Sequence, residues 1–250
     1  MNIKHFNLDA IKAARTDIKT APSGFRYGYI PHFFREDSYQ ELAKTFPDVK
    51  KFKLVDKQSG GGHKRFYTGS HYYSGLTWGC ICHMQNLPSV WKEILEQSAD
   101  PKFIELLQDV TGVTFNSLCN FGLTYGNEGC VQEPHIDGAV REDDPSPIHS
   151  TIAAILYFNE HPDPIGGTCV YAPDRMTILA QAPHLRNGFF FFEQHSQAWH
   201  GFPKMPLGAE RRVVSLSYSQ ESKPIKLKGS PFHRLTCTYR LKNAFRKILR

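Results

Sequence analysis

The second half of this chain consists of short β-prone segments that follow one another without a long helix between them. From Thr114 onward, runs rich in Val, Ile, Phe, Tyr and Thr are separated by turns rich in Gly, Pro and Asn. The expected strands are 115–126, 150–159, 166–171, 175–183, 187–193 and 211–219. Strands that follow one another through turns rather than helices pair antiparallel, as in a sandwich or a barrel. The pattern therefore predicts a mainly β fold for this half.

The first third of the chain predicts helices and loops. Asp37–Phe46 has apolar residues at helical spacing behind an expected N-cap at Asp37, and 88–109 carries similar apolar faces. Ser59–Gly62 reads SGGG and predicts a flexible loop, because the phosphate-binding Gly-x4-Gly-Lys pattern is absent. Without a linker or repeat, we expect one domain over 1–250, with an N-terminal support (1–113), a β core (114–220) and a basic tail (221–250).

Charge and cysteine usage exclude several classes of protein. The net charge is +6, but Ser222–Arg250 holds nine basic and no acidic residues, so the rest of the chain is slightly acidic and predicts no nucleic-acid surface. No apolar run is long enough to cross a membrane, and the charged N-terminus is unlike a signal peptide. The six scattered cysteines predict free thiols in the cytoplasm, and Cys80 and Cys82 lack the partners of a zinc site.

His135-Ile136-Asp137 is the motif that points to chemistry. Residues i and i+2 of a strand share a face, so His135 and Asp137 are expected to project toward one point. His200, delivered by a later strand, would complete a set of two histidines and one carboxylate, which binds Fe(II) and leaves positions open for co-substrate and dioxygen. His195 is a rival ligand, although a hydrogen-bonding loop residue is its more ordinary interpretation. Arg211 and Arg212 begin the last strand, where an arginine is able to pair with a carboxylate.

Together these residues resemble the Fe(II)/2-oxoglutarate-dependent oxygenase superfamily, and most of all its prolyl 4-hydroxylase-type catalytic domain. The matching positions are Tyr125, His135-Ile136-Asp137, 156–159, Gly166-Gly167-Thr168, 187–192, His200 and Arg212. The resemblance implies a double-stranded β-helix, or jelly roll, so the fold expected for the whole chain is mainly β with flanking helices (α+β). The N-terminal third and the tail match far less distinctly.

The resemblance also implies the roles of individual residues. His135, Asp137 and His200 become the iron ligands, and Arg212 the partner of the distal carboxylate of 2-oxoglutarate, with Tyr125 as a second hydrogen-bond donor. We prefer Arg212 to Arg211 because it shares strand parity with Val214, Leu216 and Tyr218, the last being the expected aromatic of the family. The implied cofactors are Fe(II) and the co-substrate 2-oxoglutarate, and a role for ascorbate is left open.

The implied activity is hydroxylation of an unactivated C–H bond, with dioxygen and 2-oxoglutarate consumed. We favour a free amino acid or amino-acid-like metabolite as substrate, since the chain has no peptide-binding repeat and no evident polymer-binding surface. A prolyl or other side-chain hydroxylase acting on a protein is the alternative. A nucleic-acid demethylase and a non-catalytic jelly-roll module are less favoured, and the sequence leaves the oligomeric state open.

Two further segments are open to two interpretations each. Arg65 lies upstream of the β core and would either bind a substrate carboxylate or remain a solvated arginine on an edge strand. The C-terminal residues Leu241, Phe245, Ile248 and Leu249 predict a basic amphipathic helix. We expect that helix to pack on the outer sheet, and docking to an anionic membrane or acidic partner is the alternative.

Overall fold

The computed structural model describes residues 3–69, 87–137, 150–161 and 163–220. Several sequence expectations therefore fall outside the described residues, namely those for Cys80, Cys82 and the C-terminal helix. Within the described part, no helix is long and apolar enough to span a membrane. Cys130 and Cys169 are buried free thiols, as expected, and Cys119 is also buried.

Helices are confined to the first half of the described chain. The α-helices are α1 Leu8–Ala13, α2 Glu36–Lys44, α3 Ser89–Ser98 and α4 Pro101–Thr111, with short 3-10 helices η1 Ala14–Asp17 and η2 Val49–Lys51. The strands of the first half are β1 Lys19–Thr20, β2 Arg26–Pro31, β3 Lys53–Ser59, β4 Gly62–Thr68 and β5 Ser117–Gly126. Those of the second half are β6 Val131–His135, β7 Ser150–Phe158, β8 Cys169–Tyr171, β9 Ile178–Gln181, β10 Arg186–Glu193, β11 Trp199–Phe202 and β12 Arg211–Ser219.

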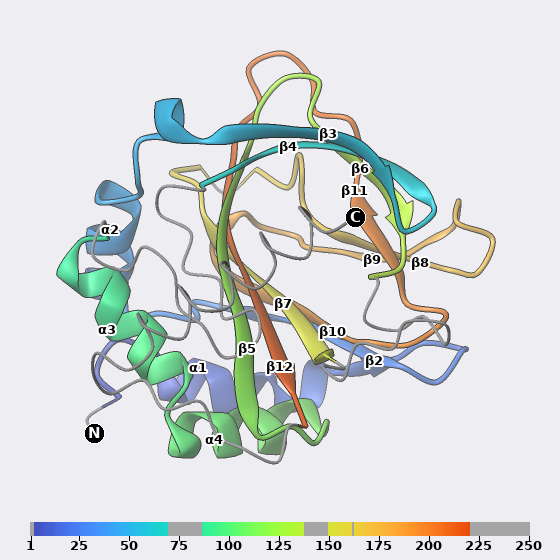
Figure 1. The fold of residues 1–250 in the computed structure, drawn as a ribbon. Coiled ribbons are helices and arrows are strands. Elements are labelled where there is room, and N and C mark those ends of the chain that lie inside the picture. The colour runs from blue at the N-terminus through green and yellow to red at the C-terminus, as the bar shows by residue number, and fades with distance from the viewer. Residues whose placement is uncertain (1–2, 70–86, 138–149, 162, 221–250) are drawn as a thin grey trace, which may run out of the picture.

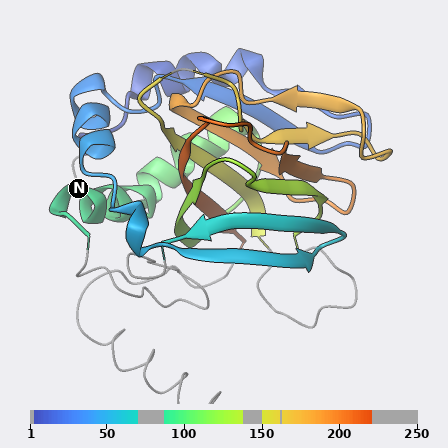
Figure 2. The same cartoon turned by 90° about the horizontal axis from the view of Figure 1, so that it is seen from above.

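All strands belong to one antiparallel sheet that curls upon itself (Figure 1). Its order is β1-β2-β10-β7-β12-β5-β4-β6-β11-β8-β9, and β3 pairs with β4. In Figure 2 the cyan β3–β4 hairpin lies along one edge of the β-structure, and the blue-violet N-terminal helix lies along the opposite edge. The sheet thus encloses an interior, which is the space between β7, β10 and β12 on one side and β6, β8 and β11 on the other.

The two faces of the sheet support two hydrophobic cores. The outer core packs the four α-helices against β5, β7, β10 and β12, with Trp91, Phe103, Phe121 and Leu216 among its fully buried members. Amphipathic helices bury their apolar stripe in this way, which stabilises both layers. The interior core contains Tyr157, Phe190, Phe192, Val170 and Val213 from both walls. The interior is therefore largely filled and apolar, except where polar side chains enter it.

The strands expected in the second half of the chain are present, and the predicted mainly β fold with flanking helices is confirmed. The predicted N-cap at Asp37 is wrong, because α2 begins at Glu36 and its N-cap is Arg35. The predicted helix-rich stretch 88–109 divides into two helices, since Asp100 caps α4 and Pro101 cannot continue α3. The N-terminal third also differs from the prediction of helix and loop alone, because it contributes β1 to β4 to the sheet.

The SGGG sequence forms the tip of the β3–β4 hairpin and not the predicted flexible loop. Ser59 pairs with Gly62, and Gly60 and Gly61 form the turn with φ of +65° and +94°. A turn of this kind needs positive φ at both central residues, which glycine adopts without strain. The carbonyl of Gly60 accepts a hydrogen bond from the backbone N–H of Ile136 at 3.1 Å. The hairpin tip therefore lies directly against the segment that carries the His-x-Asp motif.

Candidate active site

His135 and His200 lie side by side on the neighbouring strands β6 and β11. They are directly opposite in the antiparallel register, which brings side chains of one face close together. Their ring centroids are 4.2 Å apart, and Phe192 of the facing wall packs 4.3 Å from the His200 ring. His135 is 2% exposed and His200 is 6% exposed. The strand pairing thus holds two imidazoles in the interior beside an apolar wall.

The hydrogen bonds of the two rings select the same tautomer. The Nδ1 atom of His135 lies 2.8 Å from the Glu133 carbonyl, and that of His200 lies 3.0 Å from the Ala198 carbonyl. A carbonyl only accepts, so each Nδ1 carries the proton and donates it, and each Nε2 presents a lone pair. Burial lowers the pKa of His135 to about 4, and the charge of the neighbouring His200 is the second cause of this shift. The His135 ring is therefore neutral at physiological pH, and the neutral imidazole is the form that binds a metal.

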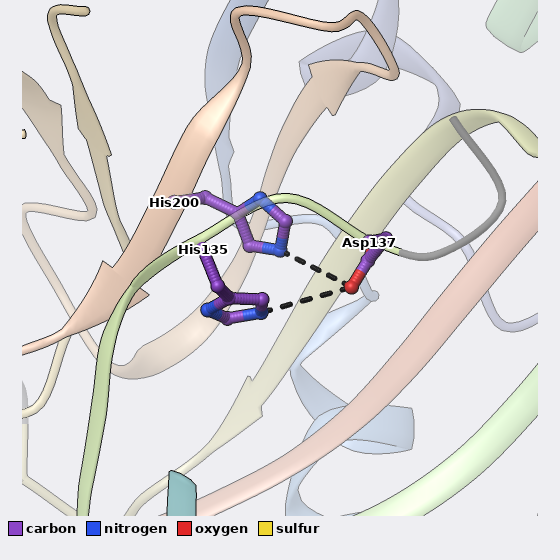
Figure 3. A group of neighbouring side chains, drawn as sticks. All are labelled: His135, Asp137 and His200. Carbon is purple, nitrogen blue, oxygen red and sulfur yellow. Dashed lines mark ion pairs between the residues drawn. The ribbon is translucent and has the colours of Figure 1, made fainter. Parts of the chain in front are cut away.

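Asp137 completes the group from just beyond the end of β6, which stops at His135. Its Oδ1 atom lies 3.7 Å from Nε2 of His135 and 3.6 Å from Nε2 of His200 (Figure 3). Burial would raise the pKa of Asp137, but the positive charge that His200 and His135 carry when protonated outweighs burial and holds the pKa well below its usual value. The prediction that His135 and Asp137 share one face of a strand is thus only partly right, because Asp137 lies in the segment after the strand.

The three side chains fit a metal ion. One donor atom from each of the three lies within 4.8 Å of the others. Two ligands at right angles, each about 2.1 Å from a metal, are about 3 Å apart, so a small movement of Asp137 would close the site. Two neutral imidazoles and one carboxylate form the facial donor set typical of non-haem Fe(II). The predicted residues His135, Asp137 and His200 are therefore brought together, with lone pairs directed at a common point.

Gln194, at the end of β10, supports the carboxylate and was not found by sequence reasoning. Its Nε2 donates to Oδ2 of Asp137 at 2.9 Å, which leaves Oδ1 facing the histidines. The Oε1 atom of Gln194 is buried without a hydrogen-bond partner among the described residues. Residues that hydrogen-bond a ligating carboxylate fix its orientation. A lone glutamine after a strand carries no sequence signal for such a role.

Arg211 enters the interior from β12. It is 4% exposed, and its guanidinium donates to the Gly166 carbonyl at 2.8 Å and to Oγ1 of Thr168 at 3.0 Å. The same group lies 4.4 Å above the Phe202 ring. Burial lowers the pKa of Arg211, yet no carboxylate lies within 4 Å of it among the described residues. A buried guanidinium without an anion is costly, so this position suits an anionic ligand.

Arg212 points to the opposite face of β12. Its partly buried guanidinium lies 3.4 Å from Glu160 and 3.1 Å from Glu210. Tyr125 is directly opposite Arg212 in the register with β5 and so shares this face. Burial and the charge of Glu210 raise the pKa of Tyr125. Arg212 does share the predicted parity with Val214, Leu216 and Tyr218, but that face packs under the helices rather than lining the interior.

The other residues weighed from the sequence have ordinary structural roles. Nδ1 of His195 accepts from the backbone N–H of Gln197 at 3.1 Å, in the loop between β10 and β11. Nη1 of Arg65 donates to Asp56 at 2.6 Å on the hairpin, and both side chains are partly exposed. Lys64, the residue before Arg65, was overlooked. It is half-buried, and its charge acts on both Asp137 and His135.

Comparison with known proteins identifies relatives by fold rather than by sequence. No protein-family model matches the chain, and no curated sequence resembles it significantly. Among solved structures it is similar to a Pseudomonas putida prolyl-4-hydroxylase at 15% identity and a TM-score of 0.55, over 86% of this chain and 99% of that one. It is also similar to an oxidoreductase of the 2OG-Fe(II) oxygenase family from Burkholderia pseudomallei at 14% identity and a TM-score of 0.53, over 88% and 93% of the two chains.

A third similar structure is the non-haem α-ketoglutarate-dependent epimerase SnoN from nogalamycin biosynthesis. It shares 13% identity at a TM-score of 0.52, over 90% of this chain and 89% of that one. At such identities the likeness concerns the fold. The chain therefore has the jelly-roll fold of the 2-oxoglutarate/Fe(II) oxygenases, including those of the prolyl 4-hydroxylase type, which agrees with the resemblance in the sequence.

Proposed function

We propose that this protein is an Fe(II)- and 2-oxoglutarate-dependent dioxygenase that hydroxylates an unactivated C–H bond. The observation that carries the proposal is the convergence of one donor atom each from His135, Asp137 and His200 within 4.8 Å, on the inner wall of a jelly roll. When bound, iron with 2-oxoglutarate and dioxygen supplies the oxidising chemistry. The protein binds these molecules, orients them and keeps the interior dry.

Each residue of the site has a distinct task in this proposal. Nε2 of His135, Nε2 of His200 and Oδ1 of Asp137 hold the iron, and Gln194 holds the other carboxylate oxygen away from it. The remaining coordination positions stay open for co-substrate and dioxygen. Apolar neighbours such as Phe192 exclude water from one side of the site.

Arg211 is the residue we propose for the distal carboxylate of 2-oxoglutarate. It is supported by burial, by its position in the interior and by the lack of an anionic partner among the described residues. Arg212, which strand parity favoured, is already paired with two glutamates, and Tyr125 shares its face. Tyr157 is fully buried with its ring centroid 5.8 Å from the Arg211 guanidinium, so it is the more suitable neighbour for the same carboxylate.

We propose a free amino acid or amino-acid-like metabolite as the substrate, with a prolyl or other side chain of a protein as the alternative. The fold is compatible with both, since the similar structures include a prolyl-4-hydroxylase and an epimerase from nogalamycin biosynthesis. Fold likeness alone does not select a substrate, because one fold supports many functions. Chemical features of the site must make that choice.

The proposal is tested by succinate release from 2-oxoglutarate with Fe(II), using a panel of the twenty amino acids and of proline-containing peptides. We expect 2-oxoglutarate turnover that one group of compounds stimulates, with a hydroxylated product found by mass spectrometry. The His200→Ala variant is the control, since it removes one iron ligand. Absence of both Fe(II) binding and 2-oxoglutarate turnover in the wild type would contradict the proposed activity.

A further inference from the structure

Lys64 of β4 projects into the interior beside the metal ligands. It is directly opposite Gln132 of β6, and Gln132 is directly opposite Phe202 of β11. Opposite residues of antiparallel strands share a face, so Lys64 lies on the face of the buried Phe202. Phe66, two residues after Lys64, packs against the same buried cluster. The neighbouring Arg65 points the other way and pairs with Asp56.

The charge of Lys64 acts electrostatically on the candidate metal ligands. It acts on both Asp137 and His135. Burial lowers the pKa of Lys64, whereas the charge of Asp137 raises it. Among the described residues, no carboxylate comes within 4 Å of the ammonium. Lys64 is therefore a half-buried cation that faces the site without an anion in direct contact.

Charge balance indicates what such a cation would bind. In the loaded site, the two positive charges of iron and the one of Arg211 equal the negative charges of Asp137 and of the two carboxylates of 2-oxoglutarate. The ammonium of Lys64 is then a surplus charge in a half-buried position, where an unpaired ion is costly. A further anion beside the metal would remove that cost. A lysine on a flexible stem is suited to meet one carboxylate as a point charge.

We propose that Lys64 binds a carboxylate of the organic substrate, and that the substrate is consequently a small free acid such as an amino acid with an unmodified carboxyl group. This inference rests on the proposed function and names the substrate class of the same site. A carboxylate could come from 2-oxoglutarate or from the substrate. The substrate is the source we infer, because Arg211 is available for the distal carboxylate of 2-oxoglutarate and iron neutralises the other.

The first part of the test measures binding of 2-oxoglutarate to the Mn(II)-loaded protein without oxygen, by isothermal titration. The variants are Lys64→Met, which keeps the stem and removes the charge, and Lys64→Arg, which keeps the charge. Lys53→Met is the matched control, since Lys53 is exposed on the adjacent strand β3. We expect all three to bind 2-oxoglutarate within about twofold of the wild type, whereas Arg211→Lys binds it at least about tenfold more weakly.

The second part titrates the Mn(II)- and 2-oxoglutarate-loaded protein with the twenty amino acids, with the corresponding amino-acid amides and with proline peptides blocked at both ends. We expect the wild type to bind at least one amino acid at least about tenfold more tightly than its amide, the size expected for one charge-assisted contact. Lys64→Met should reduce this preference to about twofold or less. Lys64→Arg should retain most of it, and Lys53→Met should retain all of it.

Three outcomes would overturn the inference while leaving the proposed function standing. The first is a loss of 2-oxoglutarate affinity in Lys64→Met as large as in Arg211→Lys, which would assign Lys64 to the co-substrate. The second is an unchanged preference for acid over amide in Lys64→Met. The third is binding of blocked peptides but of no free amino acid. Failure of the wild type to bind Mn(II) and 2-oxoglutarate at all would instead refute the proposed function itself.

Discussion

Exchanging Arg211 for Met should separate stability from co-substrate binding. The side chain is 4% exposed and donates to the Gly166 carbonyl and to Thr168, without a carboxylate partner among the described residues. Removing a buried charge that lacks an anion relieves a desolvation cost, whereas losing its hydrogen bonds costs about 1–3 kcal/mol for each acceptor left unsatisfied. These effects have opposite signs. We therefore expect the metal-free Arg211→Met variant to unfold within a few degrees of the wild type.

The stabilisation that 2-oxoglutarate provides should change far more. At a ligand concentration of about 100 times Kd, binding stabilises the folded state by about 2.7 kcal/mol. For a domain of this size that raises Tm by roughly 5–10 °C. Loss of a charge-assisted contact of about 3 kcal/mol weakens binding by roughly 150-fold. At the same concentration the remaining stabilisation is about 0.3 kcal/mol, or roughly 1 °C.

The assay is thermal unfolding of the Mn(II)-loaded protein with and without 2-oxoglutarate, for the wild type, Arg211→Met and Arg212→Met. Arg212→Met is the matched control, because Arg212 is the adjacent residue and is paired with Glu160 and Glu210 on the other face. It should keep the full shift. If Arg212→Met loses the shift and Arg211→Met keeps it, then our assignment of the two faces of β12 is wrong.

Further predictions concern the metal ligands and their support. His200→Ala should abolish Mn(II) binding in a fluorescence titration while the far-ultraviolet circular dichroism remains native, and tight binding by this variant would exclude His200 as a ligand. Gln194→Leu should raise the metal dissociation constant by about 10–100-fold in the same titration, because Asp137 loses the donor that orients it; an unchanged constant would refute that role. In the metal-free protein, burial lowers the pKa of His135 from 6.5 to about 4, so the unfolded chain binds more protons between these values and stability falls as pH decreases. Urea unfolding should detect a loss of about 3 kcal/mol between pH 7 and pH 4 that His135→Gln lacks, and equal pH dependence in both proteins would contradict it.

The convergence of the three candidate ligands was predictable because their spacing along the chain reflects backbone geometry. β6 ends at His135, so Asp137 follows it from the next segment, and the Phe-rich strand before His200 fixes where the second imidazole lies. The structure brings these residues together with Asp137. Their support was not predictable, because Gln194 and the carbonyls of Glu133 and Ala198 act through contacts that no local pattern encodes.

The choice between the two arginines shows a limit of alternation as a signal. Alternation tells which residues share a face, and it correctly groups Arg212 with Val214 and Leu216. It does not tell which face is enclosed. The more apolar face, with Val214, Leu216 and Tyr218, packs under the helices, whereas Val213 shares the interior face with Ser215 and Ser217. The more polar face of this strand is therefore the one that lines the interior.

The strands β3 and β4 were missed for a related reason. Their residues are mostly polar or charged, and β3 is largely exposed, so neither strand shows the apolar alternation typical of a half-buried strand. They are held by pairing with one another and with β5 and β6. This pairing is what brings Lys64 to the metal ligands. A sequence pattern therefore located the candidate ligands but not the hairpin that lies beside them.

The place of β2 beside β10 has a consequence for how the protein acquires its structure in the cell. The backbone N–H of Arg26 donates to Glu193, which is 167 positions further along the chain. At a synthesis rate of about 5–20 residues per second, the early strand leaves the ribosome roughly 10–30 s before its partner exists. Such distant pairings are slow to form and leave strand edges open meanwhile. We therefore expect the yield of folded protein to rise when chaperones that cover exposed strand edges are abundant.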